Sequence, residues 1–387
     1  MKIAFIGQKG MPAVTGGVEK HVEELSIHLA NLGHNVTVYN RPRYTQKMLK
    51  EYRGVNLINL PSIPTKHLDA ISHTFFACLH AIFFRNFDII HFHSIGPSSL
   101  IWLFKIFKPK TPVIATFHIQ CYHHKKWGKF ARGCLRGGEY VLCRLADKVI
   151  TVSKILKIYV WKKYDREAVY IPNGVKQQSS VPAQIIKARW GLEKNSYIVV
   201  VSRLIAHKGI HHVIDAYNRL ATDKKLVIVG NGYFTDEYTS RLEEMAAGNK
   251  NIIFTGNQTS LTLAELFSNA YFFIQPSEAE GMSIALLEAM SFSKAVLVSD
   301  IPANLEVVNG YGFIFKNKDA SDLKKMMKYL LAHPQLVASR GKFARDYVNK
   351  KFNWERISEE IVDVYFEALR EKRPLELLES AGINRNL

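Results

Sequence analysis

The segment SYIVVVS (196–202) decides the fold class, because it begins a second series of short apolar runs that alternate with helical segments. Runs rich in β-branched residues and bounded by polar or turn residues predict parallel strands buried on both faces. The runs that follow it are KLVIVG (225–230), NIIFTG (251–256), YFFIQP (271–276) and AVLVSD (295–300). The second half of the chain is therefore predicted to be a doubly wound α/β domain.

The same alternation occupies the first half of the chain. The predicted strands there are KIAFIG (2–7), NVTVYN (35–40), VNLINLP (55–61), DIIHFHS (88–94), PVIATFH (112–118) and KVITVS (148–153). Between the first two, the apolar residues Val18, Val22, Leu25, Leu29 and Leu32 recur at spacings of three and four, which predicts one helical face. Two such series predict two doubly wound domains joined near residues 171–182. Their ligands should bind at the carboxyl ends of the strands.

The charge of the chain is strongly uneven. The 387 residues are 47% hydrophobic and 22% charged, which is ordinary globular composition, but 52 Lys and Arg face 34 Asp and Glu, a net of +18. Residues 1–180 hold 26 of these cations and 10 of the acids, whereas residues 181–387 hold 26 and 24. The first half is therefore expected to face an anionic partner.

The sequence contains no recognisable export, membrane-spanning or zinc-binding pattern. The start MKIAFIGQKG leads directly into a predicted strand, and no long uncharged apolar stretch follows, so a cytoplasmic protein is expected. Three of the cysteines, at 121, 134 and 143, lie near His118, His123 and His124, but there is no C-x2-C pair and the spacing fits no common zinc template. Reduced cysteines are the expected state, for Cys78 as well.

Two strand-to-helix loops carry candidate phosphate ligands. GQKGMPAVTGGVE (7–19) opens a helix, and the backbone N–H groups of Gly16 and Gly17 suit a phosphate, although a simple tight turn fits equally well. The loop matches neither the dinucleotide fingerprint nor the P-loop. In VSRLIAHKG (201–209), Arg203 and Lys208 are suited to neutralise a diphosphate, and solvated surface cations are the alternative.

The segment QPSEAEGMSIALLEAM (275–290) carries the most specific signal. Glu280 precedes a helix and Glu288 lies about two turns into it, so the two carboxylates are on the order of 10 Å apart. They are too far apart to share a proton or a metal ion, but they suit the hydroxyl groups at two ends of an extended ligand. The N–H groups of Gly281, Met282 and Ser283 lie between them, where a phosphate would bind. These features describe a site for a nucleotide-sugar.

Motifs along the chain resemble those of family 4 of the retaining glycosyltransferases. The E-x7-E segment EGMSIALLE (280–288) resembles the family pattern, and other matching motifs follow the family's order. They are GGVEKHVEELS (16–26), TFH (116–118), ITVS (150–153), IPNGV (171–175), VSRLIAHKG (201–209), VIVGNG (227–232), FTG (254–256), EVVNGYGFIF (306–315) and FNWERI (352–357). The resemblance implies the GT-B architecture, with two doubly wound Rossmann-like domains that face each other across a deep cleft.

The resemblance also implies a domain plan. Residues 1–180 would form the acceptor-binding domain and residues 181–352 the nucleotide-sugar-binding domain, while helices in 353–387 would cross back to the first domain. The implied reaction moves a hexose-type sugar from a nucleotide-diphosphate sugar to an acceptor hydroxyl, with retention at the anomeric carbon.

Site roles carry over from the family residue by residue. Arg203 and Lys208 would hold the donor diphosphate, Glu288 the ribose hydroxyls and Glu280 the transferred sugar. Backbone groups of residues 281–283 would contact sugar and phosphate, and Gly16 and Gly17 would line the cleft. His118 would lie beside the sugar, although the family more often has a glycine after this histidine, where TFHIQ has isoleucine; a packed histidine is the alternative. No D-x-D-like loop is evident, so neither a metal ion nor a cofactor is expected.

Two basic and apolar segments predict the acceptor side. They are residues 73–110 and residues 121–144, the second with Lys125, Lys126, Lys129, Arg132 and Arg136 around Trp127 and Phe130. Such mixtures are typical of a surface lying on anionic lipid, although part of the first segment should pack on the sheet. A peripheral enzyme on the cytoplasmic face of a membrane, with a lipid-linked saccharide as acceptor in polysaccharide or glycolipid synthesis, is therefore expected.

Two other functions are weighed against this one. A GT-B-fold nucleotide-sugar epimerase would use a similar donor site, but it would not need a basic acceptor domain. A basic nucleic-acid-binding protein without catalysis is disfavoured, because no recognised nucleic-acid module occurs and the acidic E-x7-E segment would repel a phosphate chain.

Overall fold

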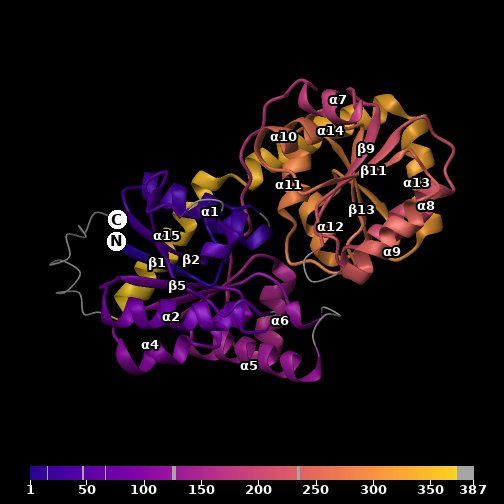
Figure 1. Cartoon of the computed structure of the whole chain (residues 1–387). Helices are drawn as coiled ribbons and strands as arrows, with labels where there is room; N and C mark the ends of the chain where they lie inside the picture. The colour runs from indigo at the N-terminus through magenta and orange to yellow at the C-terminus, as the bar shows by residue number, and fades with distance from the viewer. Residues whose placement is uncertain (15, 46–47, 66, 124–127, 233–235, 373–387) are drawn as a thin grey trace. The chain divides into compact units, whose positions relative to one another are not determined.

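The chain forms two compact units, each built on its own parallel sheet (Figure 1). The computed structural model describes residues 1–14, 16–45, 48–65, 67–123, 128–232 and 236–372. The first unit comprises Met1–His123, residues 128–173 and residues 354–372, and the second is Gly174–Asn353. The chain therefore leaves the first unit at Asn173 and returns to it at Trp354.

Within its described residues, the first unit contains an eight-stranded sheet of order β3-β4-β2-β1-β5-β6-β7-β8. The strands are β1 (Lys2–Ile6), β2 (Asn35–Asn40), β3 (Glu51–Tyr52), β4 (Val55–Asn59), β5 (Ile89–His93), β6 (Val113–Phe117), β7 (Lys148–Thr151) and β8 (Val169–Tyr170). All neighbours pair in parallel except β3 and β4, which are antiparallel. Buried runs such as Ile3–Ile6 need cover on both faces, and helices supply it.

The helices of the first unit cover both faces of that sheet. They are α1 (Gly17–Asn31), α2 (Asp69–Phe83), α3 (Ile95–Ser98), α4 (Ile101–Phe107), α5 (Lys129–Leu145), α6 (Lys154–Tyr164) and α15 (Trp354–Lys372), with short 3-10 turns at Pro42–Tyr44 and Cys121–His123. One face packs on α1 and α15, whose residues share a core with Ile3 and Phe5. In Figure 1 the yellow helix α15 accordingly runs among the indigo strands near α1.

The second unit repeats the plan with a six-stranded sheet in the described residues, of order β11-β10-β9-β12-β13-β14, parallel throughout. Its strands are β9 (Tyr197–Val201), β10 (Lys225–Val229), β11 (Ile252–Gly256), β12 (Phe272–Gln275), β13 (Ala295–Ser299) and β14 (Phe313–Phe315). Its helices are α7 (Ile185–Trp190), α8 (Ile210–Asn218), α9 (Asp236–Ala246), α10 (Ser260–Asn269), α11 (Ile284–Ser291), α12 (Pro302–Val308), α13 (Ala320–Ala332) and α14 (Pro334–Lys351), with a 3-10 turn at Ala206–Lys208. Helices α8, α9 and α13 share the core on one face.

The prediction of two doubly wound α/β domains is confirmed. Each of the eleven predicted strands is present, and α15 lies within the expected helical region 353–387, whose residues 373–387 are outside the described part. Strands β3 and β8 have only two residues each, too few for a periodic pattern to reveal them. The predicted helical face extends to Leu32, but Leu32 is the C-cap of α1 and is 47% exposed, because the helix ends one residue earlier.

Candidate functional site

The predicted donor residues lie on loops at the carboxyl edge of the second sheet. The loop after β9 carries Arg203 and Lys208, and the loop after β12 carries residues 276–283. The two loops meet closely, since a Cβ atom on Gly209 would lie 2.1 Å from the carbonyl oxygen of Pro276. Gly209 also has φ +69°, so glycine serves both the backbone conformation and the close approach. The sequence motif thus reflects backbone packing as well as chemistry.

Glu280 is the centre of the polar network on this edge. The Lys208 ammonium group pairs directly with Glu280 Oε1. The same oxygen accepts hydrogen bonds from Gln275 Nε2 and Ser277 Oγ, each at 2.8 Å. Both side chains of the carboxylate–ammonium pair are mostly buried, at 6% exposure for Glu280 and 14% for Lys208. The carboxylate is therefore held in one position by three donors.

Arg203 lies at the same edge with its charge available. Within the described residues, its guanidinium group has no ion-pair or hydrogen-bond partner, and the residue is partly exposed. The backbone around it is fixed, because Leu204 N donates to Asn231 O at 3.0 Å and a Cβ atom on Gly230 would lie 1.9 Å from Ser202 O. An anchored loop with a free cation is suited to bind an anion.

Residues 281–283 connect this network to helix α11. Ser283 is the N-cap, and its Oγ accepts from Leu286 N at 3.3 Å. Gly281 and Met282 precede it and are buried, so their backbone groups lie at the amino end of the helix, where the helix dipole favours negative charge. Glu288 lies on the fifth residue of α11 and is partly exposed. The structure therefore brings Arg203, Lys208 and Glu280 to one edge, with residues 281–283 beside them.

In the first unit, two carboxylates that sequence reasoning missed hold the glycine-rich loop. Lys9 N donates to Glu19 Oε1 at 3.2 Å, and Ala13 N donates to Glu23 Oε2. Gly16 is the N-cap of α1 with φ +101°, and a Cβ atom on it would lie 2.0 Å from Glu19 Oε2. Both acids lie in the motif GGVEKHVEE, but only the glycines have a recognised phosphate-binding role. The loop is thus preorganised by its own helix before any ligand binds.

His118 belongs to a cluster of buried imidazoles. Its Nε2 lies 3.2 Å from His93 Nδ1, and its ring packs edge-on against His21 with centroids 4.9 Å apart. His91 stacks on His93 and bonds Tyr365 OH at 2.6 Å and Thr116 Oγ1 at 2.7 Å. Burial lowers the pKa of His21 to about 4 and holds the pKa values of His93 and His118 well below the usual range. These side chains are therefore neutral at pH 7.

The described part of the 121–144 segment is the 3-10 turn Cys121–His123 and most of helix α5, which is amphipathic. Phe130 is 86% exposed, Lys129 and Arg136 are exposed, and Arg132 is half-buried. Lys125, Lys126 and Trp127, named above with them, lie outside the described residues. Arg136 lies over the ring of Tyr122 at 5.5 Å.

The 73–110 segment divides between core and surface. Residues such as Ala77, Cys78 and Ile82 pack inside, as expected. Its exposed apolar side chains are Phe75, Phe76, Phe83 and Phe84 around α2, and Trp102, Ile106 and Phe107 on α4. The rings of Phe83 and Phe107 lie 5.7 Å apart and join the two sets into one apolar face. No helix in the described residues is both long and apolar enough to cross a bilayer.

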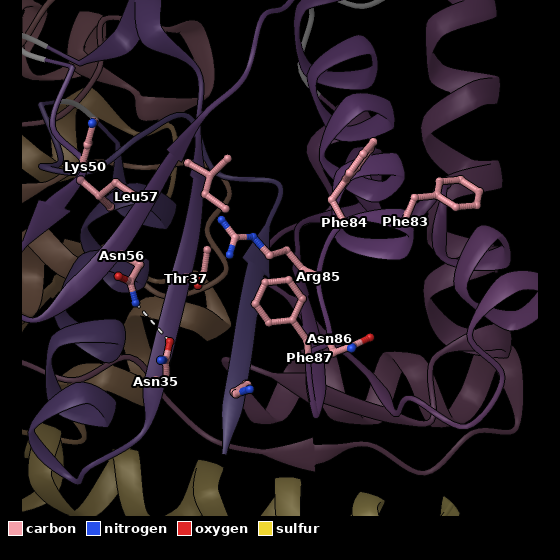
Figure 2. Close-up of a pocket in the computed structure, with 12 residues that line it drawn as sticks. Asn35, Thr37, Lys50, Asn56, Leu57, Phe83, Phe84, Arg85, Asn86 and Phe87 are labelled. Atoms are coloured by element: carbon pink, nitrogen blue, oxygen red, sulfur yellow. Dashed lines mark hydrogen bonds between the residues drawn. The ribbon is translucent and has the colours of Figure 1, made fainter.

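A pocket of about 740 Å³ opens at the edge of the first sheet where strands β1 and β2 begin (Figure 2). Its lining includes Lys2 and Asn35, which begin strands β1 and β2, together with Arg85 and Phe87 from the segment before β5. Figure 2 shows Arg85 reaching between Thr37 and Phe87. None of the predicted site residues lines this pocket, as expected for the amino ends of parallel strands.

Both units match known sequence families. Residues 183–347 match the family described as "Glycosyl transferases group 1", and residues 15–178 match "Glycosyltransferase Family 4". The chain therefore belongs to the glycosyltransferases, with a family 4 domain followed by a group 1 domain. It has the GT-B type of α/β fold.

Particular relatives extend over most of the chain. The phosphatidyl-myo-inositol mannosyltransferase of Mycolicibacterium smegmatis is 26% identical, and the match covers 91% of this chain and 90% of that protein. The sucrose-phosphate synthase of Thermosynechococcus elongatus superposes with a TM-score of 0.81 at 21% identity over 96% of this chain and 99% of that one. HepE of Anabaena, solved with UDP-glucose, superposes with a TM-score of 0.79 at 19% identity over 95% of this chain and 100% of that one.

Proposed function

We propose that the chain is a retaining, metal-independent glycosyltransferase that moves a hexose-type sugar from a nucleotide-diphosphate donor to a hydroxyl of a membrane-associated, lipid-linked acceptor. The donor part of this proposal rests on one observation. At the carboxyl edge of the second sheet, two cations and a fixed carboxylate lie on adjacent loops. HepE of Anabaena has been solved with UDP-glucose, which supports a donor of this kind.

In the proposed reaction, negative charge develops on the diphosphate as the bond to the sugar breaks. Arg203 and Lys208 would stabilise that charge, which is the role of preorganised cations in a transition state. Glu280 would hold a sugar hydroxyl, while the amides of residues 281–283 and the Glu288 carboxylate would hold phosphate and ribose. The acceptor hydroxyl attacks from the face that the nucleotide leaves, and its proton passes to a departing phosphate oxygen.

The acceptor half rests on the first unit. Its apolar face, formed by the seven exposed side chains of α2, α4 and residue 84, lies on a unit rich in Lys and Arg. An amphipathic, basic surface suits the interface of an anionic membrane. The mannosyltransferase of Mycolicibacterium smegmatis, whose name gives phosphatidyl-myo-inositol as its partner, supports an acceptor of lipid character.

The donor proposal is tested by a nucleotide-release screen of the purified chain against UDP-, GDP-, ADP- and dTDP-sugars. We expect release from one donor class, stimulated by a membrane extract that contains the acceptor. NMR of the product should show the donor's anomeric configuration, and an inverted product contradicts the retaining mechanism. Conversion of the donor to an epimeric sugar without transfer would instead identify an epimerase.

The membrane proposal is tested by co-sedimentation with vesicles of phosphatidylcholine alone and of phosphatidylcholine with phosphatidylglycerol. We expect binding to the anionic vesicles only. Binding should fall in Phe84→Ser and in a Lys129→Gln/Arg132→Gln/Arg136→Gln variant, but not in Phe343→Ser, which removes another exposed ring, in the second unit. Equal recovery of all variants with the anionic vesicles contradicts the proposal.

A further inference from the structure

Two histidines and one glutamate converge on the surface of the second unit, outside the network described above. His212 Nε2 lies 3.3 Å from Glu278 Oε1, and His211 Nε2 lies 3.8 Å from the same oxygen. The three side chains are 17–22% exposed, so they are ordered by packing but remain open to solvent. His211 and His212 lie in the first turn of helix α8, and Glu278 lies in the loop after β12.

The distances of the two imidazoles from Glu278 are close to the edge of a metal coordination polyhedron. One ligand atom from each residue can be chosen so that all three lie within 4.8 Å of one another. With metal–ligand bonds of about 2.0–2.1 Å, neighbouring ligands of a tetrahedral zinc ion are about 3.3 Å apart. The His212–Glu278 distance has this value, and the His211–Glu278 distance needs only a small rotation of one side chain.

The surroundings of the cluster fix the atoms that would bind an ion. Tyr238 OH lies 2.9 Å from His211 Nδ1 and so leaves Nε2 to face Glu278. Such an outer hydrogen bond is the usual companion of a metal-binding imidazole. Lys318 Nζ lies 3.3 Å from Glu278 Oε2, the oxygen that the imidazoles do not approach. Glu278 N donates to His207 O at 2.8 Å, which holds the two loops together.

We propose that His211, His212 and Glu278 form a binding site for a divalent ion of the zinc class, such as Zn²⁺ or Co²⁺. Two imidazoles and one carboxylate are a donor set that binds such ions in preference to Mg²⁺ or Ca²⁺, which favour oxygen ligands alone. The ion would join the start of α8 to the loop that carries Glu280, and its remaining coordination position would face solvent. The proposal does not depend on the identity of the donor sugar.

The buried cluster of His21, His93 and His118 is a weaker candidate for such an ion. His93 Nδ1 and His118 Nε2 already bond each other at 3.2 Å, and no carboxylate belongs to the set. Its three side chains are also fully buried, so an ion would have to enter a packed core. The experiment below separates the two clusters.

The test is a titration of the untagged, metal-stripped full-length chain with Co²⁺ and then Zn²⁺. We expect saturable binding of one Co²⁺, with visible absorption bands that Zn²⁺ displaces. His212→Ala and Glu278→Gln should each weaken binding by about 100-fold or more, and Tyr238→Phe by about 10–100-fold. His333→Ala, which removes an imidazole elsewhere in the second unit, should leave binding unchanged.

Lys318→Met is expected to give a result that misfolding cannot explain. It removes the cation beside Glu278, so Co²⁺ affinity should rise rather than fall. Absence of saturable binding in the wild type overturns the proposal. So does binding that survives in His212→Ala but disappears in His21→Ala, because the ion would then occupy the buried cluster.

Discussion

At the scale of single residues, the pairing of Lys208 with Glu280 gives the candidate site its character. The lysine pairs with a carboxylate that also accepts hydrogen bonds from Gln275 and Ser277. Its ammonium group is therefore held in place before a nucleotide-sugar binds. Preorganised charge of this kind contributes most where charge develops during the reaction. Arg203, without a partner in the described part of the chain, is the complementary cation.

Lys208→Ala should therefore lower kcat more than it raises KM for the donor. Loss of one preorganised donor to a developing charge typically costs about 10²–10³ in kcat. Steady-state kinetics on the donor found in the release screen measures both constants. Lys250→Ala, which removes an exposed lysine of the same unit, should change neither, and an unchanged kcat in Lys208→Ala contradicts the role given to Lys208.

Gly209→Ala should destabilise the second unit, because the new Cβ atom would meet the Pro276 carbonyl oxygen at 2.1 Å in a backbone with φ +69°. Strained backbone positions of this kind cost about 1–3 kcal/mol. Urea unfolding measures the loss. Gly248→Ala, where a Cβ atom meets nothing within 4 Å, is the matched control and should unfold at nearly the wild-type urea concentration.

At the scale of elements, helix α15 completes the core of the first unit although it follows the whole second unit in the sequence. Trp354, Ile357 and Leu369 share that core with β1 and α1. Lys148 Nζ bonds Glu367 and Glu371, both at 2.7 Å, and Lys372 Nζ lies 3.1 Å from Asp147 Oδ1. The helix has six acidic and three basic residues, so it lowers the positive charge of the unit that it joins.

Tyr365→Phe should lower the free energy of unfolding by about 1–3 kcal/mol, because it leaves His91 Nδ1 buried without its partner. Tyr365 is fully buried in α15, so no water can replace the hydroxyl group without rearrangement. Urea unfolding of Tyr365→Phe and of Tyr329→Phe, whose ring is 43% exposed, makes the comparison. Equal stability of the two variants would show that the hydrogen bond contributes nothing.

Regular elements could be predicted from the sequence because buried parallel strands such as β9 and β12 are apolar at nearly every position. The loops with Arg203, Lys208 and Glu280 could also be found, since they follow such strands. Glu19, Glu23 and His93 could not be assigned contacts, because their partners lie in irregular loops 10 to 25 positions away, whose conformation no periodic pattern predicts. The same reason hides the approach of His212 to Glu278, which are separated by 66 positions.

At the scale of the whole molecule, the two units differ in how they hold histidine. Among the described residues, the fully buried imidazoles all lie in the first unit, at positions 21, 73, 91, 93 and 118. Burial lowers the pKa of both His21 and His73 to about 4 from an ordinary value of 6.5. Between these pH values the unfolded chain binds more protons than the native one, so stability falls as the pH falls.

We therefore expect the first unit to lose stability between about pH 6.5 and pH 4, while the second loses less. His73→Leu should flatten this dependence in urea unfolding series at several pH values, since each pKa unit corresponds to about 1.4 kcal/mol at most. His333→Leu, which removes an exposed imidazole of the second unit, should leave the dependence as it is. An identical slope in His73→Leu and wild type contradicts the expectation.

The division of the first unit between the two ends of the chain has a consequence for its synthesis. A ribosome makes Met1–Asn173 long before Trp354–Lys372, so the nascent first unit lacks one wall of its core until α15 has been translated. The second unit is contiguous and has all its elements by Asn353. During synthesis the contiguous second unit can fold before α15 is made, whereas Val22, Leu25 and their neighbours stay open to chaperones until α15 emerges.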